Sequence, residues 1–95
     1  MPVLVIAEVP DLSEPAYLSM LEQLKPALEA APGFLFHAGG PSPDGGSRVV
    51  EVWESENDAE QWFDTGVKPN LPPGLIPVRT FHPLHRAFGA ASRAA

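Results

Sequence analysis

Cysteine is missing from this chain of 95 residues, and basic side chains are few. The absence of cysteine excludes disulfide bonds, thiolate metal sites and a cysteine nucleophile. Six Lys and Arg residues stand against 12 acidic residues, which gives a net charge of −6. Because the basic residues are scattered, no basic stripe is available to neutralise phosphates, and we expect no nucleic-acid partner.

Long hydrophobic runs are missing too. No apolar stretch approaches the roughly 20 residues that span a membrane, and the first run, Pro2–Ala7, is too short for a secretory signal and lacks a basic flank. We therefore expect a soluble, cytoplasmic protein with no membrane partner. The hydrophobic content of 44% is ordinary for a globular protein. At this length we expect a single domain over residues 1–88 and a frayed tail over residues 89–95.

The sequence alternates between β-rich and helix-forming segments. β-Branched and aromatic residues predict strands at Val3–Val9, Phe34–Ala38, Arg48–Trp53 and Leu75–His82. Turn residues throughout Gly39–Ser47 predict a hairpin connection between the second and third strands. Pro77 indicates that the fourth strand lies at a sheet edge or starts late, because proline cannot donate to a strand ladder.

Two helices are expected between these strands. Ser13 and Ser55 are suited to cap them, and the second helix is expected to end near Gly66. Apolar residues recur at helical spacing on one face of the first helix: Tyr17, Leu21, Leu24 and Leu28. Pro26 removes a backbone hydrogen bond inside this helix, so we expect a kink or a split near Glu22–Lys25.

The resulting order, β-α-β-β-α-β, predicts an α+β, ferredoxin-like fold with one four-stranded antiparallel sheet and both helices on one face. Such a sheet normally has a polar second face. Here both alternating sets of strand residues are apolar, for example Val3 and Val5 against Leu4 and Ile6. The simplest cover for the second face is another copy of the same sheet, so we expect a homodimer.

One segment carries a resemblance to a known family. The run Val52-Trp53-Glu54-Ser55-x-x-x-Ala59-x-x-Trp62, after a Gly-rich hairpin and before a late His-containing strand, resembles the antibiotic biosynthesis monooxygenase family. The resemblance covers most of residues 3–85. It implies a dimeric α/β barrel with a pocket in each subunit between the sheet and the helices. Family members include cofactor-independent oxygenases of aromatic polyketides, haem-degrading enzymes, and decarboxylating or cyclising relatives.

The haem-degrading branch does not fit this chain. Trp62 matches the helix tryptophan of that branch, but Pro72 stands where its haem-ligating histidine is expected. Glu8 and Val9 occupy the place of an asparagine. We therefore expect no haem, and motifs for nicotinamide or flavin cofactors are absent from the sequence as well.

His37 and Glu51 are the first catalytic candidates. If the hairpin pairs symmetrically about Asp44, position 37 lies opposite position 51 and both side chains share a face. A carboxylate in that position would orient the imidazole and raise its basicity. A slip of one residue would separate the two side chains. The alternative for Glu51 is an ion pair with Arg48 or Arg79.

Arg79 and His85 complete the catalytic candidates. An inward guanidinium at Arg79 would hold an enolate or carboxylate, whereas an outward one would be an ordinary surface or dimer ion pair. Either His82 or His85 could line a pocket mouth, His82 as a substrate-binding residue and His85 as a catalytic one. Their spacing of three residues suits a metal, but no third ligand is evident, so we expect no metal site.

Aromatic side chains supply the other substrate-binding candidates: Tyr17, Trp53 and Trp62. The resemblance then implies a cofactor-independent enzyme that oxidises a small phenolic or polyketide-like metabolite, and the residues themselves indicate His37, supported by Glu51, as the base. Two alternatives stay open. The same pocket could serve a cyclase or isomerase that works by enolisation, or the chain could be a non-catalytic ligand-binding or stress-response dimer.

Overall fold

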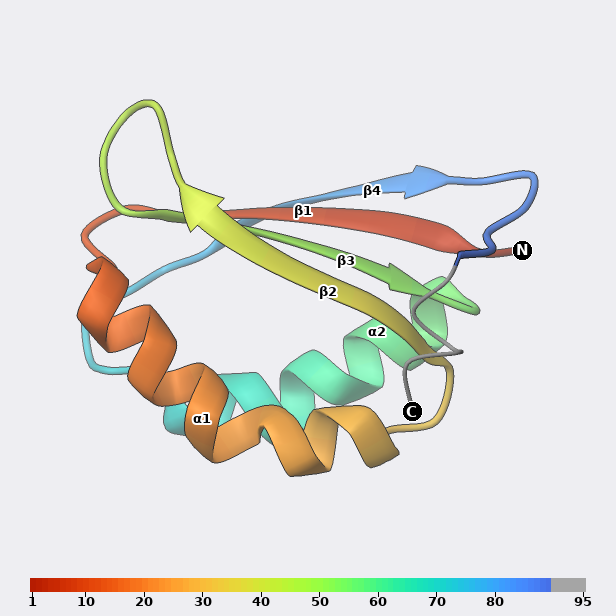
Figure 1. Ribbon diagram of the computed structural model, residues 1–95, viewed down its shortest axis with the longest axis horizontal. Coiled ribbons are helices and arrows are strands. Elements are labelled where there is room, and N and C mark those ends of the chain that lie inside the picture. Colours follow the sequence, from red (N-terminus) through yellow and green to blue (C-terminus); the bar gives the residue numbers. More distant parts are fainter. Residues whose placement is uncertain (90–95) are drawn as a thin grey trace.

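The computed structural model describes residues 1–89 and has the expected element order. The strands are β1 (Val3–Val9), β2 (Phe34–Pro41), β3 (Ser47–Trp53) and β4 (Val78–Pro83). The helices are α1 (Glu14–Ala30) and α2 (Glu56–Trp62), and α2 continues into a π-helical turn, η1 (Phe63–Val67), and a 3₁₀ turn, η2 (Lys68–Asn70). All strand pairs are antiparallel, in the order β2-β3-β1-β4 (Figure 1). The predicted ferredoxin-like α+β fold is therefore confirmed.

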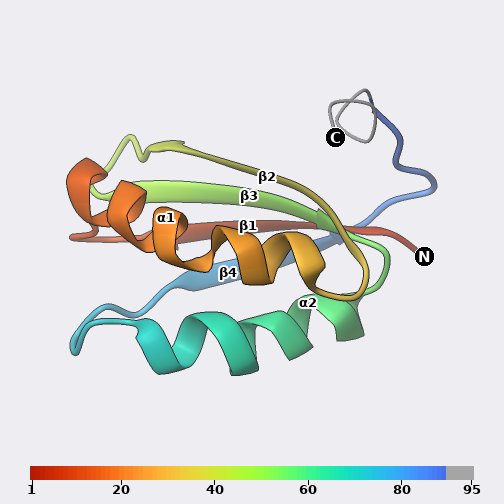
Figure 2. The ribbon, with the colours of Figure 1, turned by 60° about the horizontal axis from the view of Figure 1, so that its bottom comes forward.

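Both helices cover the same face of the sheet, as Figures 1 and 2 show. The predicted caps are present: the Ser13 hydroxyl accepts from the Ala16 amide, and the Ser55 hydroxyl accepts from the Asp58 amide. These bonds satisfy amides that have no partner within the first helical turn. The two serines thus fix where the chain leaves the sheet and begins each helix.

Of the kink or split predicted for the first helix, the split is wrong, because α1 runs without interruption from Glu14 to Ala30 with Pro26 inside it. The proline ring leaves the carbonyl of Glu22 without its usual amide donor. Glu22 lies on the exposed side of the helix, where water can satisfy that carbonyl. Packing of the apolar face against the sheet then outweighs the lost hydrogen bond.

The fourth strand starts later than Leu75, so that boundary is corrected to Val78. Pro77 directly precedes it, and its missing N–H explains the late start. Both expectations attached to Pro77 are met, because β4 is also an edge strand that pairs with β1 alone. The predicted tail, residues 89–95, lies outside the described residues except for Gly89.

The hairpin between β2 and β3 has the symmetric register expected from the sequence. Pro41 pairs with Ser47, and His37 pairs with Glu51, so both pairs are centred on Asp44. Gly45 and Gly46 adopt φ values of 91° and 77°, a left-handed conformation that a β-carbon disfavours. The connection thereby closes the hairpin in five residues and places His37 and Glu51 on one face.

A small hydrophobic core fills the space between the sheet and the helices. Trp53 is fully buried at its centre, with its ring edge-on to Phe34 and stacked at 6.4 Å on Trp62. Val3 and Val5 of β1 and Leu28 of α1 pack into the same cluster. The cluster holds α1 and α2 against the sheet and leaves space at the other end of the layer.

The opposite face of the sheet, which we call the open face, is covered by no helix of the described residues. Its residues alternate along the strands with those that face the helices: Leu4, Ile6, Phe36, Ala38, Val50, Val52, Val78 and Thr80. Phe36 and Val78 are 44% and 59% exposed. The predicted apolar second face is therefore present.

Within residues 1–89, no helix combines the length and apolarity needed to cross a membrane.

Candidate active site

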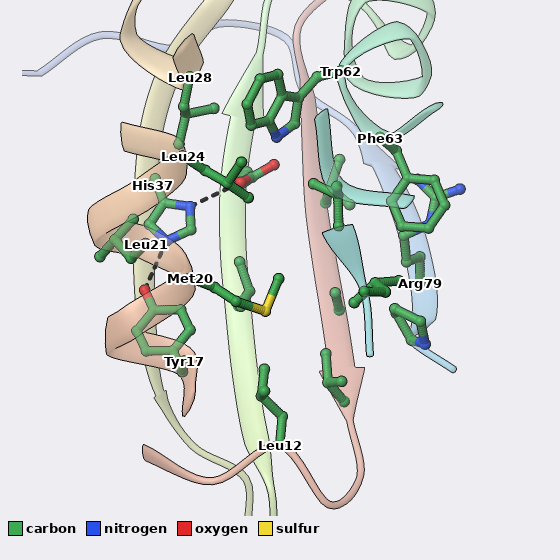
Figure 3. A pocket seen from close by; sticks show the side chains of 18 of the residues that line it. Leu12, Tyr17, Met20, Leu21, Leu24, Leu28, His37, Trp62, Phe63 and Arg79 are labelled. Carbon is green, nitrogen blue, oxygen red and sulfur yellow. Dashed lines mark hydrogen bonds and ion pairs between the residues drawn. The ribbon is translucent and has the colours of Figure 1, made fainter. Parts of the chain in front are cut away.

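A pocket of about 110 Å³ lies between α1, the α2–η1 segment and the sheet (Figure 3). The apolar walls come from the sheet and from α1: Val5, Ala7, Val9, Val49, Met20, Leu21, Leu24 and Leu28. Trp62, Phe63 and Val67 close the side formed by α2 and η1. Against these walls stand a few polar groups, from Tyr17, His37, Glu51 and Arg79. The arrangement combines an apolar container with convergent polar groups, which is typical of a small-molecule site.

His37 and Glu51 are in direct contact, as their register predicts. Nδ1 of His37 lies 2.8 Å from Oε2 of Glu51, and the two side chains are 14% and 15% exposed. The other carboxylate oxygen of Glu51 accepts a bond of 2.9 Å from the indole N–H of Trp53. A carboxylate held by two N–H donors orients the imidazole and stabilises the positive charge that it gains with a proton.

The chain of hydrogen bonds extends one residue further, to Tyr17 on α1. The Tyr17 hydroxyl lies 2.7 Å from Nε2 of His37, and the two rings are nearly parallel (Figure 3). Because Glu51 only accepts, the imidazole proton sits on Nδ1, and Nε2 accepts from the Tyr17 O–H. Four side chains from three elements, β2, β3 and α1, therefore form one connected network.

Burial raises the pKa of the Tyr17 phenol above its ordinary value of 10.0, and the negative charge of Glu51 raises it further. Tyr17 is the chain's single tyrosine, so its absorbance titration reports this group alone. We expect a midpoint above 10.0 in the native protein. In Glu51→Gln the rise should be smaller, because the carboxylate charge is lost, but it should not vanish, because burial is the larger cause. The free energy of unfolding should fall as the pH rises through this range, since the unfolded chain releases the proton first.

The urea-unfolded chain is the control for this titration, because it should return the midpoint to the ordinary value of a free tyrosine. A native midpoint equal to the unfolded one would contradict the burial of the Tyr17 hydroxyl. An unchanged midpoint in Glu51→Gln would instead contradict its electrostatic coupling to the carboxylate.

Arg79 takes the inward orientation, at the end of the pocket near η1. Its side chain is 20% exposed, and its guanidinium lies 3.7 Å from the centre of the Phe63 ring. Nη1 is 2.7 Å from a carboxylate oxygen of Glu60 on α2. The positive charge is thus already balanced by a carboxylate of the protein, so Arg79 combines the inward orientation of one expectation with the ion pair of the other.

The two tryptophans have different positions relative to the pocket. Trp62 lines it, as expected for a substrate-binding residue. Trp53 does not reach the pocket and is fully buried behind Glu51, where its N–H holds the carboxylate. Trp53 therefore lies behind the carboxylate and not at the pocket wall, where it was expected as a substrate-binding residue.

His82 and His85 lie outside this pocket. His82 is exposed, bonded to the Thr80 hydroxyl at 3.0 Å, and His85 is exposed beyond the end of β4. The separation follows from strand alternation: with Arg79 directed inward, His82 three residues later is directed to the opposite face. The polar groups of the pocket therefore come from Tyr17, His37, Glu51 and Arg79, without these two histidines.

Two contributors to the site were not identified from the sequence. Gly39 leaves room for the Tyr17 hydroxyl, because a β-carbon at this position would overlap the phenol. Glu60 binds Arg79 in place of Glu51, and Arg48 pairs with Glu8 on the open face, so the alternative ion pairs of Glu51 do not form. Neither contributor has a local signal, since both depend on how the helices pack against the sheet.

Solved structures of several proteins share this fold. A candidate monooxygenase from Shewanella loihica PV-4 superimposes with a TM-score of 0.65 at 22% identity, over 90% of this chain and 96% of that one. A variant of SnoaB, a cofactor-independent oxygenase from Streptomyces nogalater, gives 0.67 at 15% identity, over 90% and 95%. MhuD, solved with two manganese protoporphyrin IX molecules per active site, gives 0.64 at 21% identity, over 94% and 99%.

No protein-family model matches the sequence, and no significant match is found among curated proteins. The likeness therefore establishes the fold, and the expected resemblance to monooxygenase-like proteins is confirmed at that level. The chemistry of this chain has to be inferred from its own pocket.

Proposed function

We propose that this protein is a cofactor-independent enzyme that deprotonates a small phenolic or polyketide-like metabolite and lets the anion react with dioxygen. The observation that carries the proposal is the Glu51–His37–Tyr17 network at one side of an otherwise apolar pocket. A neutral imidazole backed by a carboxylate is a suitable general base near neutral pH. The description of SnoaB as a cofactor-independent oxygenase on the same fold supports this choice.

The reaction needs no external reductant. A phenolate is electron-rich, so it can supply the four electrons that reduce dioxygen fully. One oxygen atom forms a new carbonyl on the ring, the other leaves as water, and the phenol becomes a quinone. The protein's part is to remove the phenolic proton, to hold the anion in place and to exclude bulk water.

The dimensions of the pocket limit the part of the substrate that it can enclose. A cavity of about 110 Å³ is smaller than the roughly 300–1,000 Å³ of sites for drug-sized ligands and suits about one aromatic ring. A second, open groove of about 440 Å³ shares Phe63, Leu71, Pro77 and Arg79 with it. A larger, polyketide-like substrate would place its phenolic ring in the pocket and its remainder in this groove.

The proposal is tested with 4-nitrophenol, whose visible absorbance distinguishes phenol from phenolate, and with 1-naphthol in an oxygen electrode. We expect the bound nitrophenol to be ionised at a pH where the free compound is mostly neutral, and 1-naphthol to cause oxygen uptake. Ionisation of bound 4-nitrophenol without oxygen uptake from 1-naphthol would favour the cyclase or isomerase alternative. Binding without ionisation would overturn the enzymatic proposal in favour of a ligand-binding protein.

The proposed assembly is a homodimer in which two open faces pack against each other. Each of the four strands contributes apolar side chains to this face, with the Arg48–Glu8 ion pair at one end, and no element of residues 1–89 covers it (Figure 2). Large exposed apolar patches on a soluble domain mark interaction surfaces. A second copy is the occupant that offers a matching sheet of the same shape and polarity.

A lysine at Val50 should dissociate this dimer, because it places a charge near the centre of the open face. Sedimentation at micromolar concentration is expected to show a dimer for the original chain and a monomer for Val50→Lys. The matched control is Leu18→Lys, an apolar-to-lysine change on the outer side of α1, where Leu18 is already 52% exposed. A monomeric original chain would contradict the proposed assembly.

A further inference from the structure

Both ring nitrogens of His37 are already occupied in the network. Nδ1 faces the Glu51 carboxylate at 2.8 Å, and Nε2 faces the Tyr17 hydroxyl at 2.7 Å. A substrate that enters the pocket therefore finds no free imidazole nitrogen. Direct abstraction by His37 would require the Tyr17 ring to move away, and α1 packs that ring against β2 beside Gly39.

We propose that the Tyr17 hydroxyl is the catalytic group that takes the proton from the substrate and passes its own proton to His37. The inference rests on the proposed function and identifies the atom at which the proton is exchanged. The substrate O–H bond breaks as its proton binds the Tyr17 oxygen, and the Tyr17 O–H bond breaks as its proton binds Nε2. The products are the substrate anion, an intact Tyr17 phenol and a His37 imidazolium paired with Glu51.

The hydrogen-bonding capacity of a phenol permits this exchange. A tyrosine hydroxyl has one O–H donor and acceptor capacity on its oxygen, so it can donate to Nε2 and accept from a substrate at the same time. Burial and the Glu51 charge keep Tyr17 protonated, since they raise its pKa. Tyr17 thus acts as a relay, because it loses a proton only as it gains another.

Gly39 gives a second, independent way to disturb the relay. A β-carbon at Gly39 would overlap the Tyr17 hydroxyl and push it away from His37. Gly39 does not have a positive φ, so alanine is compatible with its backbone. The next residue, Gly40, has open space where a β-carbon would stand, which makes Gly40→Ala the matched control.

The experiment measures the rate of oxygen uptake with 1-naphthol in Tyr17→Phe, Gly39→Ala and Gly40→Ala, with calorimetry of 4-nitrophenol binding for the affinity of the pocket and circular dichroism for the fold. Tyr17→Phe leaves Nε2 free, so direct abstraction by His37 would keep or raise the rate. The relay predicts that the rate falls by about 10²-fold or more in Tyr17→Phe. It predicts a similar fall in Gly39→Ala and no change in Gly40→Ala.

The outcomes separate the relay from the proposed function. Turnover in the original chain that persists in a folded Tyr17→Phe overturns the relay and leaves the general-base proposal intact. If Tyr17→Phe fails to fold, Gly39→Ala decides, and an unchanged rate in that variant also overturns the relay. Absence of turnover in the original chain overturns both proposals together.

Discussion

The variant His37→Gln is expected to lose most of the proposed phenol-deprotonating activity, with a fall of about 10² to 10⁴ in turnover. Glutamine is similar in size to histidine and can still bond to Glu51 and Tyr17, so the network and the fold should survive. It cannot accept a proton at the position of Nε2, and therefore the proton of the substrate has no destination. Turnover is measured as oxygen uptake with 1-naphthol, and stability by thermal unfolding.

The matched control for this prediction is His85→Gln, which makes the same change at an exposed histidine outside the pocket. It should leave turnover unchanged. Full activity in His37→Gln would contradict the proposed base. A large loss of turnover in His85→Gln alone would instead indicate that His85, after the last strand, is the catalytic histidine, as the sequence first suggested.

The variant Trp53→Ala is expected to lower the free energy of unfolding by about 3–5 kcal/mol. Trp53 is the one fully buried large side chain among the described residues, and it joins β3 to Phe34 and Trp62. Small domains have only about 5–15 kcal/mol in total. This single change therefore removes a large part of the stability, which urea unfolding measures directly.

Two further variants separate the packing of Trp53 from its hydrogen bond. Trp53→Phe keeps most of the ring but removes the N–H, so a mostly buried oxygen of Glu51 loses its donor at a cost of about 1–3 kcal/mol. Phe88→Ala, at a side chain that is 90% exposed, should change stability by less than about 0.5 kcal/mol. A loss in Trp53→Ala no larger than that in Phe88→Ala would contradict the central position of Trp53.

Local signals in the sequence were sufficient for most of the fold and for one contact of the site. Serine caps, proline positions and strand alternation are short-range features, and they located the elements to within a few residues. The His37–Glu51 contact was predictable because the turn residues around Asp44 set the hairpin register, and register decides which side chains share a face. The same alternation, applied from Arg79 to His82, already places the two on opposite faces.

The remaining contacts depend on tertiary packing. The bond from Tyr17 to His37 joins α1 to β2, and the pair of Arg79 with Glu60 joins β4 to α2. Neither follows from spacing, because the position of a helix on the sheet is set by the volumes of many side chains at once. Pro26 shows the same effect, since packing kept α1 continuous where the local rule allowed a split as well as a kink.

Consecutive side chains of β3 point to opposite faces of the sheet and therefore have different surroundings. Odd-numbered Val49 and Glu51 line the pocket, whereas even-numbered Val50 and Val52 lie on the opposite side of the strand. Adjacent codons of one short segment are therefore free to evolve under separate pressures. Under the proposed assembly and function, self-association would change at the even positions while the chemistry at the odd ones is preserved.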